Sequence, residues 1–386
     1  MNVLLSSFVR WWNAEAAYAA TLAEGLREAG HRVWVLTTPG TRNEAELRRR
    51  ELPLVTHLPP GNAPPWRWWG AVSGLAAFQR ENDIDVVNVF RSQEYPLHVL
   101  ANRLSGGRAA LVRTRGTDRA IRRNWLNTKL HRDWCDGHIA ASGVVQERMV
   151  AALHLPPESI QVIYYPAFPE PQPNDSRKQA LRLALLDELG FDPDTLLLAI
   201  VGRLYPEKGH AVALEALEEL VVLHPQVRLV ILAKNAPGED PERPVLEAMV
   251  ARKGLEQHVR FLNFREDVQQ LMGGIDVGVV PSLASEVNCR VAVEFFTAGT
   301  PVVAFPTGAL PEVVENGISG LVTEDYSPEV LTATLARIAG DADLRKRLGE
   351  GAGEAARNRF SRVGFVAATL AAYEAAKVAK GQPRNG

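Results

Sequence analysis

The chain has few cysteines, with two among its 386 residues, and no long apolar run. Cys135 and Cys289 lie far apart, so they form no disulfide framework of the kind found in small secreted proteins and fit a reducing cytosol. No uninterrupted apolar run reaches the roughly 18 residues that a membrane span requires. The net charge of −2 lacks the basic excess of a nucleic-acid-binding protein. We therefore expect a cytoplasmic globular protein without a nucleic-acid partner.

The length exceeds one ordinary hydrophobic core, so two domains are expected. Short apolar runs alternate with helical patterns in two successive series, which predicts an α/β protein with parallel sheets. Residues 169–177 are rich in proline and predict a linker between domains 1–168 and 178–360. The predicted strands are 3–6, 32–37, 54–57, 85–89, 110–114, 137–141 and 161–164 in the first domain, and 196–201, 227–233, 258–262, 277–280, 301–304 and 320–322 in the second.

A short basic loop, GRLYPEKG, follows the first predicted strand of the second domain. We expect Pro206 in the first turn of the next helix, with Arg203 and Lys208 converging on an anion. Gly209 would let the backbone approach that anion closely. This interpretation predicts a diphosphate site, and the alternative is an exposed basic pair beside a tolerated glycine.

Residues 281–301 place two glutamates around a predicted loop-to-helix transition, in the sequence PSLASEVNCRVAVEFFTAGTP. Asn288 is expected to cap the helix that carries Glu294. Glu294 lies on a partly apolar face, where a lone carboxylate is costly, so it requires a partner. That partner is either Arg290, four residues earlier, or a ligand diol. Glu286 is either a solvated loop carboxylate or part of the same site.

Together, these two motifs closely resemble those of the retaining GT-B glycosyltransferases of family 4, which carry a pair of glutamates separated by seven residues. The resemblance is strong over residues 196–344 and weaker in the N-terminal domain. It implies an α/β, GT-B fold with two doubly wound Rossmann-like domains facing a central cleft. It also implies that the last helix, within 361–386, packs back on the N-terminal domain.

The resemblance also implies roles for individual residues. Arg203 and Lys208 would hold the diphosphate of a nucleoside-diphosphate sugar donor, UDP- or GDP-linked. Glu294 would bind the ribose, and Glu286 would act at a hydroxyl of the transferred sugar. The loop of Asn288, Cys289 and Arg290 would complete the donor site, without a metal or other cofactor.

The sequence departs from the family pattern in both domains. After the first strand, a glycine-rich turn is replaced by RWWNAE, in which Asn13 and Ala14 are expected to contact the donor. The loop after residue 112 reads RTRGTD and lacks the histidine that many members place near the sugar. We hypothesise that Arg115 and Asp118 take over contacts to the sugar or acceptor.

All eight tryptophans lie in the N-terminal domain, together with several arginines. Aromatic faces stack on sugars and arginines pair with anions, so an anionic saccharide or glycolipid acceptor at the inner face of the cell membrane is one interpretation. The alternative is that Trp34 belongs to the core and that Arg48 to Arg50 form a solvated helix end. The tryptophans are residues 11, 12, 34, 66, 68, 69, 125 and 134.

These motifs and the family resemblance thus predict transfer of a sugar from a nucleoside diphosphate to a saccharide or lipid-linked acceptor, with retention, in cell-surface glycan synthesis. The alternatives are a sugar-nucleotide epimerase or phosphorylase of the same architecture, or a noncatalytic glycan- or nucleotide-binding protein. No metal site is expected, because no ligand spacing with cysteine or aspartate was recognised around the nine histidines. These are residues 31, 57, 98, 131, 138, 154, 210, 224 and 258.

Overall fold

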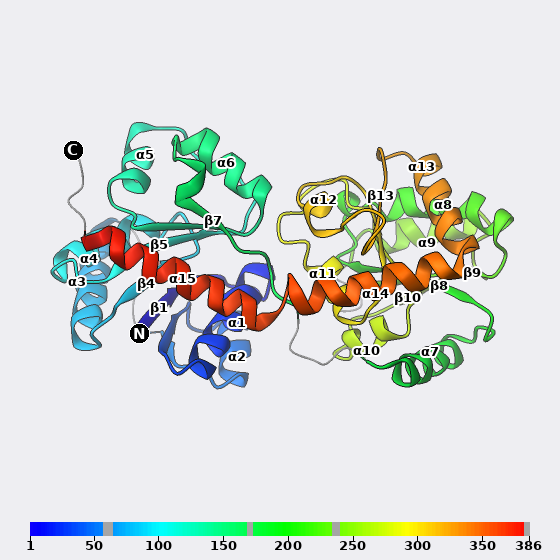
Figure 1. The fold of residues 1–386 in the computed structure, drawn as a ribbon, viewed down its shortest axis with the longest axis horizontal. Helices are drawn as coiled ribbons and strands as arrows, with labels where there is room; N and C mark the ends of the chain where they lie inside the picture. Colours follow the sequence, from blue (N-terminus) through cyan, green and yellow to red (C-terminus); the bar gives the residue numbers. More distant parts are fainter. Residues whose placement is uncertain (57–64, 168–172, 234–239, 382–386) are drawn as a thin grey trace. The chain divides into compact units, whose positions relative to one another are not determined.

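The computed structural model describes residues 1–56, 65–167, 173–233 and 240–381. The chain divides into two compact units, of which the first is Met1–Tyr165 with Arg362–Gly386 and the second is Pro166–Ser361. Parts of the predicted linker (169–172), of the third predicted strand (His57) and of the last predicted helix (382–386) lie outside the described residues. Each unit contains one parallel sheet with helices packed around it (Figure 1).

The first sheet has seven parallel strands in the order β3-β2-β1-β4-β5-β6-β7. Each predicted strand coincides with an observed strand apart from a residue or two at its ends, because short apolar runs are long enough for buried strands and too short for helices. The strands are β1 (Asn2–Ser6), β2 (Arg32–Leu36), β3 (Leu54–Val55), β4 (Val86–Val89), β5 (Ala110–Arg115), β6 (Gly137–Ala140) and β7 (Ile160–Val162).

The first sheet is buried on both faces. Along β1, Val3 and Leu5 belong to one hydrophobic cluster, and Leu4 belongs to another. Successive side chains of a strand point to opposite faces, so the two clusters lie on the two sides of the sheet. Continuous apolar strands are typical of such doubly covered parallel sheets.

The helices of the first unit follow the strands in alternation. The last one, α15, contacts α1, β5 and β6, and Tyr373 on α15 accepts a hydrogen bond from Asn88 Nδ2 at 2.7 Å. The described helices are α1 (Ala14–Glu28), α2 (Arg42–Arg49), α3 (Pro65–Glu81), α4 (Tyr95–Leu104), α5 (Trp125–Arg132), α6 (Gly143–Leu153), the 3-10 turn η1 (Pro157–Ser159) and α15 (Arg362–Gly381).

The second sheet has six parallel strands in the order β10-β9-β8-β11-β12-β13. From the central strand β8 the chain first proceeds outward to β9 and β10, and it then returns to the other side of β8 with β11. The direction of winding therefore reverses between β8 and β11, and ligands bind at such a switch point in doubly wound folds. The strands are β8 (Leu196–Gly202), β9 (Val227–Ala233), β10 (Val259–Leu262), β11 (Val277–Val280), β12 (Val302–Ala304) and β13 (Gly320–Val322).

The helices of the second unit bury one face each against this sheet or against each other, with a core formed by residues of β8, β9, α8 and α13. They are α7 (Asp175–Leu189), the 3-10 turn η2 (Pro206–Lys208), α8 (His210–Leu223), α9 (Arg243–Arg252), α10 (Val268–Gly273), α11 (Arg290–Thr297), α12 (Leu310–Val313), α13 (Pro328–Gly340) and α14 (Ala342–Asn358).

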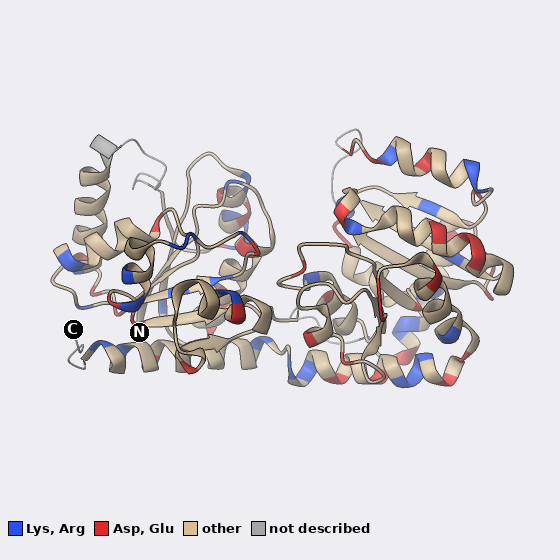
Figure 2. Ribbon diagram, turned by 90° about the horizontal axis from the view of Figure 1, so that it is seen from above, with Lys and Arg blue, Asp and Glu red and all other residues tan. Residues whose placement is uncertain are grey.

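The two C-terminal helices differ in charge. Residues of both signs are interspersed along α14, whereas α15 is mainly uncharged (Figure 2). This difference fits the burial of Phe365, Thr369 and Tyr373 of α15 in the first unit. Among the described residues, no helix combines the length and the apolar character that crossing a membrane would require.

Candidate functional site

The loop after β8 carries two of the expected donor residues. Arg203 is exposed, and its guanidinium carbon lies 4.7 Å from the centre of the Tyr205 ring. Pro206 begins the 3-10 turn η2, and α8 begins at His210. The prediction that Pro206 lies in the first turn of the helix is therefore wrong. The reason is Gly209, whose left-handed backbone separates the turn from the helix.

Gly209 allows two loops at the switch point to approach each other closely. Its φ angle is 71°, and a Cβ atom added there would lie 1.8 Å from the carbonyl oxygen of Pro281 in the loop after β11. The amide of Leu283 also donates a hydrogen bond to the carbonyl oxygen of Glu207 at 2.8 Å. Any side chain at position 209 would therefore push the two loops apart.

We predict that Gly209→Ala lowers the free energy of unfolding by roughly 2–4 kcal/mol, because backbone strain and a steric clash add. The matched control is Gly190→Ala, where φ is 67° but no atom lies within 4 Å of the added Cβ. Chemical denaturation of both variants measures the difference. Equal losses would show that the contact with Pro281 contributes nothing.

A third loop, after β12, holds the backbone of Glu286. The amide of Ala309 donates a hydrogen bond to the carbonyl oxygen of Glu286 at 2.7 Å. Gly308 has a φ angle of 57°, and an added Cβ would lie 2.0 Å from that same oxygen. The buried hydroxyl of Thr307 donates to the carbonyl oxygen of Ser282. The loops after three adjacent strands therefore form one connected structure at the carboxyl edge of the sheet.

Within this structure, the side chains of Lys208 and Glu286 form an ion pair. The Ser282 hydroxyl donates a second hydrogen bond to Glu286 Oε1 at 2.8 Å. The side chain of Glu286 is 12% exposed and that of Lys208 is 21% exposed. Glu286 is therefore a positioned carboxylate at the ligand edge of the sheet. Glu286 is thus not a merely solvated loop carboxylate, and its place in a donor site stays a prediction.

The loop that carries Glu286 has an unusual backbone. Ser285 and Cys289 have φ angles of 65° and 45°, in the left-handed region that non-glycine residues rarely adopt. Each such residue costs on the order of 1–3 kcal/mol, so its surroundings must enforce it, and such residues cluster at functional sites. The two strained residues enclose Glu286, Val287 and Asn288.

Helix α11 starts differently from the prediction. Its N-cap residue is Cys289, which makes no capping hydrogen bond with its side chain. The prediction that Asn288 caps this helix is therefore wrong, because the left-handed backbone at Cys289 displaces Asn288 from the capping position. Burial raises the pKa of the Cys289 thiol well above its ordinary value, as do the nearby Glu286 and Glu312. Cys289 is therefore a protonated, unreactive thiol at neutral pH.

Glu294 is almost fully buried in α11, with 3% of its surface exposed. Its carboxylate pairs with Arg290 one turn earlier in the helix. Of the two partners proposed for Glu294, Arg290 and a ligand diol, the structure shows the pairing with Arg290. A ribose diol on the same carboxylate stays a prediction.

The residues expected to form part of the site in the first unit are not joined to one another by hydrogen-bonded loops as those of the second unit are. Asn13 is the N-cap of α1, where its Oδ1 accepts a hydrogen bond from the Ala16 amide at 3.0 Å, and Ala14 is the first helical residue. Arg115 ends β5, is 5% exposed and donates to the carbonyl oxygen of Arg119. Burial lowers the pKa of Arg115 to about 10, with a further contribution from Arg113.

Asp118 lies in the loop after β5. Its carbonyl oxygen accepts a hydrogen bond from Arg148 Nη1 at 3.4 Å, and its charge opposes the lowering of the Arg115 pKa. The structure thus brings Asp118 and Arg115 into electrostatic contact. Any contact of either residue with a sugar or an acceptor stays a prediction.

Several of the tryptophans are exposed, and their contact with an acceptor stays a prediction. Trp11, Trp69 and Trp125 are 72%, 71% and 76% exposed. Trp34 packs edge-on against Phe78 beside the core, as the alternative interpretation predicts. Arg48, Arg49 and Arg50 pair with glutamates of the same helix, which fits a solvated helix end. The side chains of Trp66 and Arg67 lie outside the described part of the structure.

Sequence analysis missed a buried polar cluster beside β1. The Ser6 hydroxyl donates to Glu94 Oε2 at 2.9 Å, and His98 Nε2 lies 2.8 Å from the same hydroxyl oxygen. Burial raises the pKa of Glu94 to about 8 and lowers that of His98 to about 4. Both side chains are therefore predominantly neutral at pH 7. Ser6 is separated from Glu94 and His98 by about ninety positions in the chain, so no local pattern could have indicated the cluster.

Ser282, Thr307 and Gly308 were also missed in the second unit. The signal that could have indicated them is their position, because each follows a predicted buried strand of the second sheet. Residues after neighbouring parallel strands meet at one edge.

Two family models match the chain. One, described as "Glycosyl transferases group 1", matches residues 183–355, and the other, "Glycosyltransferase Family 4", matches residues 16–167. The chain belongs to the family 4, group 1 glycosyltransferases. The first match contains every candidate residue of the second unit, and the second contains Arg115 and Asp118.

Among curated proteins, D-inositol 3-phosphate glycosyltransferase from Corynebacterium efficiens is 35% identical over 174 residues, which are 44% of this chain and 41% of that protein. The enzyme of the same name from Corynebacterium jeikeium is 37% identical over 169 residues, which are 42% of this chain and 40% of that protein. The matched segments thus span less than half of the length of these relatives.

Solved structures show the same fold over nearly the whole chain. A glycosyltransferase from Rickettsia africae has a TM-score of 0.82 at 18% identity, covering 97% of this chain and 98% of that one. Alr3699/HepE from Anabaena, solved in complex with UDP, has a TM-score of 0.81 at 23% identity, covering 96% and 100%. The fold is therefore the two-domain Rossmann-like GT-B fold.

Proposed function

We propose that the protein transfers a sugar from a nucleoside-diphosphate sugar to a saccharide or lipid-linked acceptor, with retention, in the synthesis of a cell-surface glycan. The observation that carries this proposal is the pair of Lys208 and Glu286, held by three joined loops at the switch point of the second sheet. Family membership supports the reaction class. The Anabaena structural neighbour was solved with UDP-glucose as well as with UDP, which favours a uridine donor over a guanosine donor.

In this proposal the second unit binds the donor. Arg203 and Lys208 contact the diphosphate, on which negative charge increases as the bond to the sugar breaks. Cations positioned at that group stabilise the transition state more than the ground state. No metal ion is then required for the leaving group, because the two side chains and the amides at the start of α11 supply the positive potential.

The two glutamates have different tasks. Glu286, held by Ser282 and Lys208, accepts a hydrogen bond from a hydroxyl of the transferred sugar. Glu294 binds the ribose diol while Arg290 balances its charge. Asn288 and Cys289 form the wall of the site between the two carboxylates.

The first unit supplies the remaining contacts. Asn13 and Ala14 stand at the positive end of α1, which is 15 residues long, and they contact the donor from there. Arg115 and Asp118 bind the sugar or the acceptor. The curated relatives are named for a phosphorylated inositol, and an anionic acceptor of that kind fits the arginines of this unit.

The exposed tryptophans of the first unit suggest where a lipid-linked acceptor is met. Trp11, Trp69 and Trp125 offer amphipathic rings that partition to a membrane interface, so we include peripheral contact with the inner face of the cell membrane in the proposal. Co-sedimentation with anionic vesicles tests this contact. A Trp125→Ser variant that sediments as well as the parent chain would contradict it.

The reaction is tested by incubating the protein with UDP- and GDP-sugars and a panel of anionic and neutral acceptors. Mass spectrometry then identifies the products, and NMR of the new glycoside gives its anomeric configuration. A glycoside together with a free nucleoside diphosphate is the expected result. An isomerised sugar nucleotide formed without acceptor would indicate an epimerase, and nucleotide binding without any product would indicate a noncatalytic protein.

A further inference from the structure

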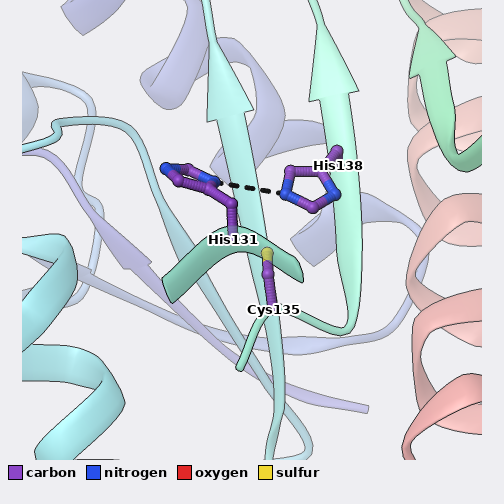
Figure 3. Close-up of side chains that lie close together, drawn as sticks. All are labelled: His131, Cys135 and His138. Atoms are coloured by element: carbon purple, nitrogen blue, oxygen red, sulfur yellow. Dashed lines mark hydrogen bonds between the residues drawn. The ribbon is translucent and has the colours of Figure 1, made fainter. Parts of the chain in front are cut away.

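Three potential metal ligands that the proposed reaction does not use meet in the first unit. His131 lies in the last turn of α5, Cys135 follows in the loop, and His138 lies in β6 (Figure 3). They form the sequence pattern His-x3-Cys-x2-His. This pattern differs from the expectation that no histidine has ligand spacing with a cysteine. The three residues lie on a helix, a loop and a strand, so only the fold shows that they meet.

The geometry of the cluster is close to that of a metal site. His131 Nδ1 lies 3.2 Å from His138 Nε2, and the ligand atoms of all three residues lie within 4.8 Å of one another. In a tetrahedral zinc site with bonds of about 2.0 Å to nitrogen and about 2.3 Å to sulfur, ligand atoms are separated by roughly 3.3–3.8 Å. Small side-chain rotations therefore suffice to place all three atoms around one ion.

The surroundings fix these side chains. His131, Cys135 and His138 are 6%, 8% and 5% exposed. The ring of Tyr95 stacks on His131 with 4.9 Å between the centroids, and its hydroxyl donates to the Leu130 carbonyl oxygen at 3.2 Å. A buried site with oriented ligands loses little conformational entropy when an ion binds.

Two features of the surroundings disfavour a bound cation, and each is balanced by another contact or charge. The first is the hydrogen bond that the two imidazoles share without a metal. The Cys135 thiol meanwhile makes weak contacts to the carbonyl oxygens of Leu111 and Gly137 and a hydrogen bond with the Tyr95 side chain. A metal bond to the thiolate is much stronger than such contacts.

The second feature is the buried guanidinium of Arg113. It donates to the Val89 carbonyl oxygen at 2.9 Å and to the Ser92 hydroxyl at 3.1 Å. Burial lowers the pKa of Arg113, and the nearby buried carboxyl of Glu15 opposes this shift. Zinc binding also releases the proton of Cys135, so the thiolate removes one of the two added charges.

We propose that His131, Cys135 and His138 bind one zinc ion, which fastens the end of α5 to β6. Soft thiolate with imidazole is a ligand set that selects zinc over magnesium or calcium. The three side chains leave a fourth position for a small ligand such as water. The ion is structural, and this proposal is independent of the proposed transferase activity.

The test uses the 386-residue chain without a polyhistidine tag. Inductively coupled plasma mass spectrometry is expected to find about one zinc ion per chain after dialysis against zinc-free buffer. After exchange with cobalt, a thiolate-to-cobalt charge-transfer band is expected in the near ultraviolet. Cys135→Ser should remove this band, while Cys289→Ser, which alters the only other cysteine, should retain it.

Chelation gives a second measurement. Removal of zinc is expected to lower the melting temperature on the order of 5–10 °C, if the holoprotein is measured with free zinc near 100 times its dissociation constant. Should Cys135→Ser fail to fold, the parent chain alone decides through its zinc content and cobalt spectrum. A parent chain that binds neither ion, or a cobalt band that survives Cys135→Ser, would overturn the proposal.

Discussion

Lys208→Ala is expected to lower kcat by on the order of 10²–10³, the loss typical for one preorganised electrostatic contact to developing charge. Lys208 is the cation that the structure places beside Glu286 at the switch point of the second sheet. Its removal takes positive charge from the leaving diphosphate. It also releases Glu286, which then keeps only the Ser282 hydroxyl among the two described partners of its carboxylate.

The matched control for this prediction is Lys253→Ala. Lys253 forms a similar ion pair with Glu218 in the same unit, and Glu218 belongs to α8, outside the joined loops. Steady-state kinetics with a donor and acceptor found by the product assay should show unchanged turnover for Lys253→Ala. If both variants lose activity equally, or neither does, Lys208 has no special role in the reaction.

Glu94→Gln is expected to stabilise the protein at alkaline pH. The pKa of Glu94 is raised by burial from 4.5 to about 8 in the folded chain. Well below pH 4.5 the Glu94 carboxyl is protonated in both the folded and the unfolded chain, so its ionisation does not change the free energy of unfolding. As the pH rises toward 8, the unfolded chain gains the free energy of ionisation first, so the folded state loses relative stability until the folded carboxyl also ionises.

The raised pKa corresponds to a loss of roughly 3–5 kcal/mol between pH 4 and pH 9. Glutamine keeps the size of the side chain and an acceptor for the Ser6 hydroxyl, but it cannot ionise. Urea unfolding at pH 5 and pH 9 should therefore show a smaller decline for Glu94→Gln than for the parent chain. Glu147→Gln, at an exposed position of α6, is the control and should decline as the parent does. Identical declines for all three proteins would contradict the assigned protonation of Glu94.

Sequence patterns predicted the fold because they depend on local composition. Apolar runs of strand length mark both sheets. The sequence also placed Glu286 and Glu294 correctly on a loop and a helix after one strand. These features need only a short window of sequence.

The details of the site required contacts between distant residues. Lys208 and Glu286 are separated by 78 positions, so their pairing depends on the order of β8 and β11 in the sheet. The left-handed backbone at Cys289 moves the start of α11 and removes the expected role of Asn288 as a cap. The close approach of Gly308 to Glu286 holds that loop from a third strand end. None of these contacts follows from residue type and spacing alone.

The central claim is that the second unit binds a nucleoside diphosphate through Lys208 and its neighbours. The most direct test is the melting temperature of the 386-residue chain with UDP, GDP, ADP, CMP and dTDP, measured for the parent chain and for Lys208→Ala. We expect UDP, or failing that GDP, to stabilise the parent by about 2.7 kcal/mol at 100 times its dissociation constant, and to stabilise Lys208→Ala far less at the same concentration. A parent chain that no nucleotide stabilises, or a variant that is stabilised equally, would contradict the claim.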